Sequence, residues 1–387
     1  MFRPFVYPAV LLFLLALTTA CEDPSNVGID LVGNQGGDPV VINVPPAVFE
    51  IEPISDITGT TTQILRTLSG RVEDPLLGTI VSTGNVDFRE SPGVSDNFRN
   101  GQITEATLQL VVDYAYGDTS RALTLALRDI PDEWDAAGST ADTVIQAAPE
   151  IVTEFNVSPT DSLVGIALPN AWIEAHSAEI RSENFNDDFH GFQLEPQEGN
   201  AVVGFSAVGV QLIVVSGGVT ATFTIAKSLS TIARTDVPDL GPDLLALQDG
   251  VGTSIEVDFD FLADSLRNTA VNRAIFLFPT DSLTPAAQTP PGFVRPRLGE
   301  LSLVGITDAG PALELIRSFP EDDGTYRFEA SGLRNIIQSM VLGKSTFERF
   351  RLTVPTDNNT INAALFYRSN SGPQRPEAVL TLTPADN

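Results

Sequence analysis

Apolar and polar residues alternate along much of this chain, and this alternation constrains the fold more than any other feature of the sequence. In the clearest run, acidic residues separate four apolar ones, namely Ile255, Val257, Phe259 and Phe261. Similar runs surround residues 108–112, 123–127, 192–194, 326–328 and 350–354. A period of two indicates strands with one buried face. Because glycine, proline, asparagine and aspartate punctuate the runs, we expect a mainly β fold of antiparallel sandwiches or barrels.

Two segments have helical spacing instead. Asn170 can cap a helix whose inner face carries Trp172, Ile173, His176 and Ile180. Ser331 can cap a second helix, with Gly343 as its stop and Leu333, Ile336, Ile337 and Met340 turned inward. The sequence therefore predicts one short helix in each half of the chain.

A similar phrase follows each predicted helix. Residues 189–196 and 347–355 both read Phe-x-x-Phe-x-Leu, then a proline, and both precede a polar turn with asparagine and an apolar strand. Residues 103–108 also correspond to residues 271–276. These matches predict two tandem jelly-roll-like β-sandwich domains, spanning 48–233 and 234–387, although chance similarity of amphipathic strands is an alternative.

Two loops stand out beside the predicted domains. Residues 236–242, with two prolines and a glycine, suit a connector between the copies. The proline-rich stretch Thr284–Pro296 reads as a long loop inside the second copy, and loops of that length are often functional.

The amino terminus has the features of a secretory leader. One basic residue, Arg3, precedes an uncharged stretch that ends at Cys21, the only cysteine of the chain. We interpret residues 1–20 as a lipoprotein signal peptide, Cys21 as the acylated residue and residues 21–47 as a flexible tether. Thr18 stands where a leucine is usual, so a plain secreted protein with an idle Cys21 thiol is the alternative.

The composition excludes several classes of binding partner and of stabilising site. The formal net charge is −28, and such a surface repels nucleic acid and anionic lipid, so neither is expected as a partner. With one cysteine, neither an intramolecular disulfide nor a cysteine-based zinc site is possible.

Several short motifs resemble those of a lipoprotein family of Bacteroidota known as domain of unknown function 4270. They are the segments 21–25, 26–31, Glu73–Thr79, Tyr114–Asp118 and Phe185–Phe192. The resemblance implies a β-rich lipoprotein of the outer membrane, and Glu22 and Asp23 resemble a signal for export to its outer face. Residues 108–134 are also similar to jelly-roll modules that assist surface polysaccharide enzymes. No catalytic residue is implied.

Motifs for catalysis are weak. His176 and His190 are isolated and read as structural histidines, and no nucleophile elbow or phosphate-binding loop occurs. Trp134 lies among Asp132, Glu133 and Asp135, so it can contact a sugar, although a ring that plugs one end of a sandwich is the simpler interpretation.

Cofactors and metal ligands are not expected, apart from a structural calcium ion held by loop oxygens. Its candidate ligands are Asp187, Asp188 and the turn Glu321-Asp322-Asp323-Gly324, which otherwise read as solvated turns.

The leading hypothesis is a non-enzymatic surface lipoprotein that presents β-sandwich domains to a glycan or to an envelope protein. A carboxylate-dependent glycan hydrolase is one alternative, because carboxylates are the abundant reactive group of the chain, although fifty acidic residues form close pairs without any catalytic role. A scaffold subunit of an envelope secretion or assembly machine is another.

Overall fold

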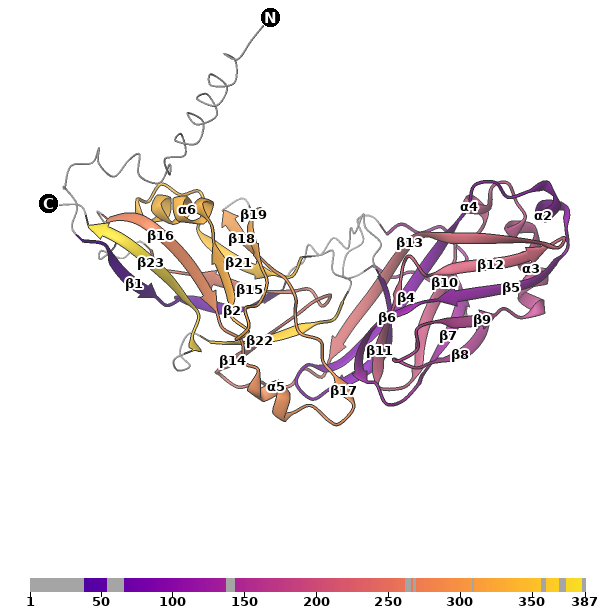
Figure 1. Ribbon diagram of the computed structural model, residues 1–387, viewed down its shortest axis with the longest axis horizontal. Helices are drawn as coiled ribbons and strands as arrows, with labels where there is room; N and C mark the ends of the chain where they lie inside the picture. The colour runs from indigo at the N-terminus through magenta and orange to yellow at the C-terminus, as the bar shows by residue number, and fades with distance from the viewer. Residues whose placement is uncertain are drawn as a thin grey trace, which may run out of the picture.

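The computed structural model describes residues 38–53, 66–136, 143–261, 266, 269–307, 310–355, 360–368 and 374–384. Two β-sandwiches lie side by side and form an elongated, bent body (Figure 1). All paired strands named below are antiparallel, which confirms the predicted mainly β, tandem-sandwich fold. The predicted leader, Cys21, Glu22 and Asp23 lie outside the described residues. Within the described part, no helix is long and apolar enough to cross a membrane.

The first sandwich contains strands β3 to β13. Their bounds are β3 Arg66–Asp74, β4 Gly78–Glu90, β5 Ile103–Leu110, β6 Val112–Asp118, β7 Leu123–Asp129, β8 Thr153–Val157, β9 Val164–Ala167, β10 Phe192–Glu198, β11 Ala201–Ser206, β12 Gln211–Ser216 and β13 Val219–Thr235. One layer has the order β6-β11-β3-β4-β13-β12-β5-β9, and β8-β7-β10 forms the other. The long β4 joins the layers, because it pairs with β3 through its first residues and with β10 through Gly84–Val86.

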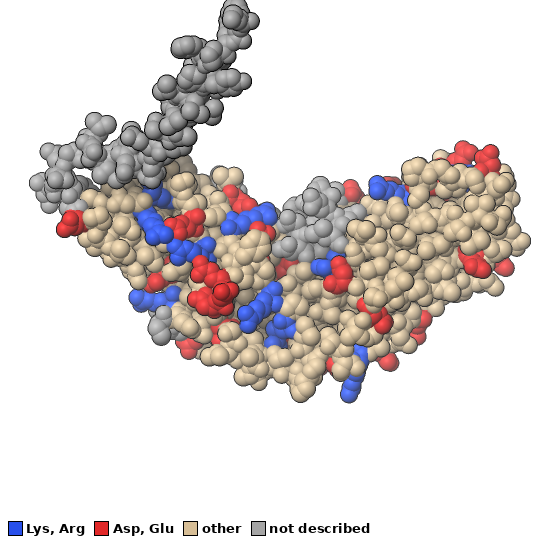
Figure 2. All heavy atoms as spheres, in the orientation of Figure 1, with Lys and Arg blue, Asp and Glu red and all other residues tan. Residues whose placement is uncertain are grey.

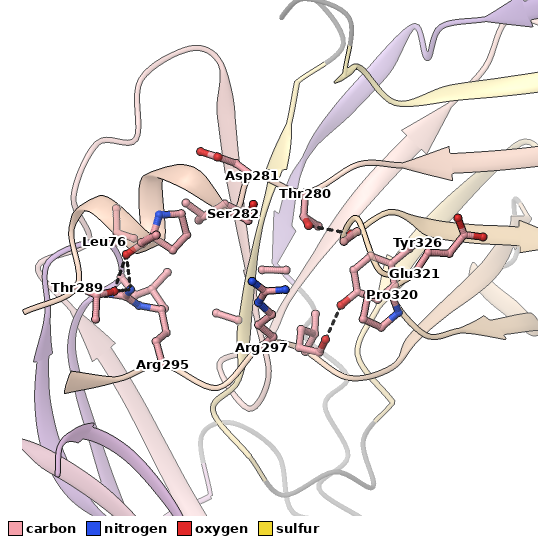
Figure 3. A pocket seen from close by; sticks show the side chains of 18 residues that line it. Leu76, Thr280, Asp281, Ser282, Thr289, Arg295, Arg297, Pro320, Glu321 and Tyr326 are labelled. Atoms are coloured by element: carbon pink, nitrogen blue, oxygen red, sulfur yellow. Dashed lines mark hydrogen bonds between the residues drawn. The ribbon is translucent and has the colours of Figure 1, made fainter. Parts of the chain in front are cut away.

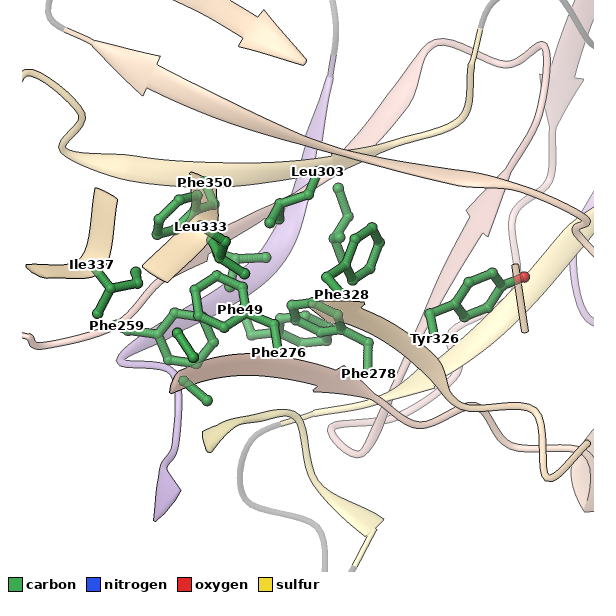
Figure 4. Packing of buried hydrophobic residues seen from close by; sticks show 14 of the residues in the cluster. Phe49, Phe259, Phe276, Phe278, Leu303, Tyr326, Phe328, Leu333, Ile337 and Phe350 are labelled. Atoms are coloured by element: carbon green, nitrogen blue, oxygen red, sulfur yellow. The ribbon is translucent and has the colours of Figure 1, made fainter. Parts of the chain in front are cut away.

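The second sandwich contains β14 to β16 and β18 to β23, whereas the short β17 between them pairs with the first sandwich. Their bounds are β14 Leu244–Gln248, β15 Thr253–Asp258, β16 Thr269–Phe278, β17 Phe293–Val294, β18 Leu301–Thr307, β19 Gly310–Ser318, β20 Tyr326–Glu329, β21 Arg349–Thr353, β22 Ala363–Tyr367 and β23 Glu377–Pro384. Between its layers lies a core rich in phenylalanine, including Phe276, Phe278, Phe328 and Phe350 (Figure 4). The edge-to-face contacts among these rings stabilise the core beyond the contribution from burial of their apolar area.

The two predicted helices are present. Helix α3 spans Asn170–Ile180 and buries Trp172, Ile173 and Ile180, and α6 spans Ser331–Val341 and covers the second core with Leu333 and Ile337 (Figure 4). Among the described residues, three shorter helices accompany them, namely α2 Asp96–Asn100, α4 Phe185–Asp188 and α5 Leu283–Ala287. Each of these has only four or five residues, too few for a helical period to show in the sequence.

Strand pairing repeats between the sandwiches. The order β4-β10-β7-β8 recurs as β15-β21-β18-β19, and β12-β5-β9 recurs as β23-β16-β20. The pair β3 and β11 recurs as β14 and β22. The sequence match of residues 103–108 with residues 271–276 therefore falls on equivalent strands, β5 and β16.

The domain boundaries differ from the prediction at the amino-terminal side. Strand β1 (Val40–Val44) pairs with β23, and β2 (Val48–Pro53) pairs with β15. Residues 40–44 are thus a strand and not part of a tether ending at 47, and residues 48–53 belong to the second sandwich and not the first. Pro45 and Pro46 interrupt the alternation of this segment, which is why it reads as a linker.

Candidate functional site

A third hydrophobic core joins the two sandwiches. The two-stranded ribbon of β14 and β22 supplies one side of it, because Ala246 and Leu365 point to this core whereas Leu247 and Phe366 point into the core of the second sandwich. Leu68, Val72 and Ile80 of the first sandwich, among others, form the opposite side. Alternate residues of one ribbon thus face two cores, as the pleat of a strand requires, and the sandwiches are packed together as one body.

A buried carboxylate lies at this junction. Asp74 ends β3, and its side chain is 0% exposed. It accepts hydrogen bonds from the backbone N–H groups of Leu76 and Leu77 and from the hydroxyl of Tyr116 on β6. Arg295 donates through Nε at 2.8 Å and through Nη2 at 2.9 Å, which makes a bidentate ion pair between the sandwiches. Burial and the neighbouring Asp74 charge raise the pKa of Tyr116, which keeps this hydroxyl a donor.

Arg295 reaches the first sandwich on the proline-rich loop. The loop was expected to lie inside the second copy, but its short strand β17 pairs with β6, with Phe293 opposite Asp118. Gly292 has a φ of +79° and its carbonyl accepts hydrogen bonds from the N–H and hydroxyl groups of Thr119. Phe293 packs edge-on against Tyr116, with ring centroids 5.9 Å apart. The loop is therefore a clamp between the two sandwiches.

A pocket of about 270 Å³ opens beside this clamp (Figure 3). Its apolar walls include Leu76, Leu77, Leu298, Ala363 and Leu365. Its polar lining includes Thr280, Asp281, Thr289, Arg297 and Glu321. The walls therefore come from both sandwiches, and the volume lies near the lower end of small-molecule sites, which is about 300 Å³.

Arg297 and Glu321 are the charged side chains of this pocket whose hydrogen-bonding atoms are unpaired. Within the part of the chain that the structure describes, neither side chain makes a hydrogen bond or an ion pair, and both are exposed. Figure 3 shows Arg297 in the middle of the pocket with no hydrogen bond drawn to it, whereas Arg295 is bonded to Thr289. The pocket thus offers a free donor group and a free acceptor group.

Asp281, the other lining carboxylate, is already engaged. It accepts hydrogen bonds from the N–H groups of Leu283 and Thr284 and from the hydroxyl of Tyr367. Burial raises its pKa, but these hydrogen bonds outweigh burial and leave the pKa below its usual value. Asp281 is therefore an ionised residue that holds the start of α5 in place.

The structure places Trp134 in a small core and not in the pocket. The ring is 9% exposed and packs with Ile130 and Ile145. Its indole N–H donates to the carbonyl of His190 at 2.9 Å, and the ammonium of Lys227 lies 5.0 Å from the ring centroid. Both the donor and a face of the ring are thus occupied, so the geometry favours the structural interpretation of Trp134 over contact with a sugar.

The remaining predicted residues are dispersed. No cluster of three metal-ligating side chains occurs among the described residues, and the calcium candidates at 187–188 and 321–324 lie in different sandwiches. His176 stacks on Trp172 with a centroid distance of 4.6 Å, and its Nδ1 bonds Glu179 at 2.7 Å. The hydrogen bond to Asp129 contributes most to raising the pKa of His176 to about 9, against the effect of burial.

Comparison with known proteins identifies no family for this chain. No family model and no curated protein matches the sequence, so the resemblance to domain of unknown function 4270 stays a prediction from short motifs. Among solved structures, the chain is similar to a chain of the Macrobrachium rosenbergii nodavirus, with 10% identity and a TM-score of 0.15. That match covers 90% of this chain and 98% of the viral chain. A TM-score this low carries no argument about fold or function.

Two of the motifs that carried the resemblance meet at the junction. Asp74 comes from the segment Glu73–Thr79 and Tyr116 from the segment Tyr114–Asp118. Sequence reasoning missed Arg295 and Arg297, although both lie within or next to the proline-rich loop that it singled out. The signal was an arginine pair at the end of that loop, in a chain that has few basic residues.

Proposed function

We propose that this protein is a non-enzymatic, lipid-anchored outer-membrane protein that binds a neutral glycan at the cell surface, in the pocket between its sandwiches. The observation that carries the proposal is the junction pocket with its free guanidinium, Arg297, and its free carboxylate, Glu321. A sugar hydroxyl both donates and accepts hydrogen bonds, so a site with one unpaired donor group and one unpaired acceptor group suits it. The apolar walls suit the C–H face of the same ring.

Overall charge favours a neutral ligand over an acidic one. The chain has a formal net charge of −28, which repels polyanions over distances of about 8 Å at physiological ionic strength. Basic and acidic side chains lie interspersed over the second sandwich and the junction (Figure 2). A polyanion therefore finds no continuous basic surface on the face shown.

The anchor and the fold support the same arrangement. Strand β1 starts at Val40 and belongs to the second sandwich, at the end away from the first (Figure 1). With a lipid on Cys21, the second sandwich would lie next to the membrane. The pocket and the first sandwich would then lie further out, where a surface glycan is accessible.

The hydrolase alternative requires a carboxyl group with a raised pKa facing a second carboxylate. In the pocket, Asp281 has a lowered pKa, so binding is the function that this geometry favours. The other alternative is an envelope-protein partner, which is either a ligand of the sandwiches or a machine that they scaffold. Co-purification with an outer-membrane barrel would detect this partner.

A glycan array tests the proposal directly. The mature chain with Cys21→Ser should bind neutral oligosaccharides and not acidic ones. Titration calorimetry with the tightest of them should then show weaker binding by Arg297→Ala. Loss of one hydrogen bond from a charged donor costs about 1.5–3 kcal/mol, which is roughly a 10- to 150-fold increase in Kd.

Arg334→Ala is the matched control. Arg334 is an exposed arginine on α6 that does not line the pocket, so its removal should leave Kd unchanged. Equal Kd values for Arg297→Ala and the unmodified chain would exclude the pocket as the site, and an array without any bound glycan would exclude the function.

A further inference from the structure

The two sandwiches differ in the origin of one strand. In the first, β13 pairs with β12 through its first residues and with β4 along most of its length. It follows β12 directly, across Gly217 and Gly218, which have φ values of +57° and +73°. In the second sandwich the equivalent neighbours are β23 and β15, and their partners are β1 and β2 from the amino-terminal side of the chain. The segment 38–53 therefore occupies the position of β13.

The segment fits this position closely. Strand β1 pairs from Val40 opposite Leu382 to Val44 opposite Ala378, and β2 continues along β15. Ala47 donates its N–H to the carbonyl of Asp258 at 2.7 Å between the two ladders. Phe49 is 7% exposed and stacks on Phe278, with centroids 5.9 Å apart. The segment thus completes the second core, and the chain runs on from the segment into the first sandwich.

We infer that residues 38–53 are an exchangeable strand, and that the surface formed by β23 and β15 also accepts this segment from a second copy of the chain. The segment is connected to β3 through residues 54–65, and twelve residues span at most about 40 Å. In an exchanged dimer every ladder bond and the packing of Phe49 are identical to those in the monomer, which makes such exchange a low-cost route to association. A second copy is the partner because only it carries the same residues in the same register.

Exchange leaves the glycan proposal untouched. The segment does not line the junction pocket, and the residues that form the pocket stay within one chain. A dimer that binds no glycan and a monomer that binds glycan are therefore distinguishable results.

Single cysteines on two batches of protein detect the exchanged state. In mature chains with Cys21→Ser, one batch carries Val41→Cys and the other carries Thr381→Cys. These two residues are directly opposite in the β1–β23 register, and Val41 is 63% exposed. The batches are refolded together from urea and oxidised. We expect a covalent dimer linked between positions 41 and 381, as found by peptide mass spectrometry.

Two controls complete the experiment. One measures random collision between cysteines, and the other tests disulfide closure within a single chain. Val208 is 89% exposed in the first sandwich, so a batch with Val208→Cys mixed with the Val41→Cys batch measures random pairing. The 41–381 dimer should exceed this background about tenfold or more, because a disulfide requires Cα atoms within about 7 Å. A chain with both Val41→Cys and Thr381→Cys, oxidised at low concentration without prior unfolding, should close internally and stay monomeric in size-exclusion chromatography with light scattering.

Two results would overturn the inference. Internal closure of the double variant with no 41–381 dimer above the Val208 background would show that the segment stays with its own chain. Failure of both pairs to oxidise would contradict the register on which the inference rests.

Discussion

Replacement of Arg295 by methionine should uncouple the two sandwiches, because it removes the cation from a carboxylate that water does not reach. The side chain of Asp74 is 0% exposed and that of Arg295 is 8% exposed. Removing one partner of such a pair leaves an uncompensated buried charge, at a cost of about 3–5 kcal/mol. The double variant Asp74→Asn with Arg295→Met buries no net charge, so it should recover part of this loss.

Urea unfolding followed by two signals measures this effect. Both tryptophans, Trp134 and Trp172, belong to the first sandwich, so their fluorescence reports that sandwich, whereas far-ultraviolet circular dichroism reports both. We expect the two transitions to coincide in the unmodified chain and to separate in Arg295→Met, with a lower free energy of unfolding for at least one sandwich.

A neighbouring exposed pair provides the control. Arg71 and Glu73 form an ion pair at 2.8 Å with side chains 53% and 65% exposed, and such pairs contribute about 0–1 kcal/mol. If Arg295→Met cost no more than Arg71→Met and its two transitions still coincided, the buried pair would not couple the sandwiches and the reasoning would be refuted.

Two further predictions concern the first sandwich. The pKa of His176 is raised from 6.5 to about 9, so its protonated form stabilises the fold fully below about pH 6.5 and this contribution is lost as pH rises through about 9. The free energy of unfolding should therefore fall by an amount of the order of 2 kcal/mol between about pH 6.5 and pH 9. If the free energy of unfolding had the same pH dependence in His176→Gln as in the unmodified chain, the prediction would be wrong. Gly191 and Gly93 have φ values of +87° and +90°, but a Cβ would lie 1.9 Å from the Val86 carbonyl at Gly191 and touches nothing at Gly93. In thermal unfolding, Gly191→Ala should cost clearly more than the about 1–2 kcal/mol expected for Gly93→Ala, and equal costs would contradict the close approach.

The repeated plan was predictable because strand and helix periods are local properties of the sequence. The runs around Leu108 and Ile255 and the two eleven-residue helices follow from spacing alone. Gly191, in a phrase that the sequence already singled out, is explained by the approach of β10 to β4 at Val86.

The junction was not predictable, because pairing between distant segments leaves no local period. Asp74 and Arg295 are 221 residues apart in the chain, and the sequence around either residue does not indicate that the other is its partner. The same limit explains the strand β1, whose partner β23 lies at the opposite end of the described chain. Short, proline-interrupted strands of this kind read as linkers until their partners are known.

Arginine Nε–Hε resonances of the mature chain, followed while the tightest neutral oligosaccharide from the array is titrated, test the central claim most directly. Arg297 should shift and saturate with the Kd found by calorimetry, while the exposed Arg334 stays in place. An unchanged Arg297 signal at full saturation, or equal shifts for the two arginines, would contradict a glycan site in the junction pocket.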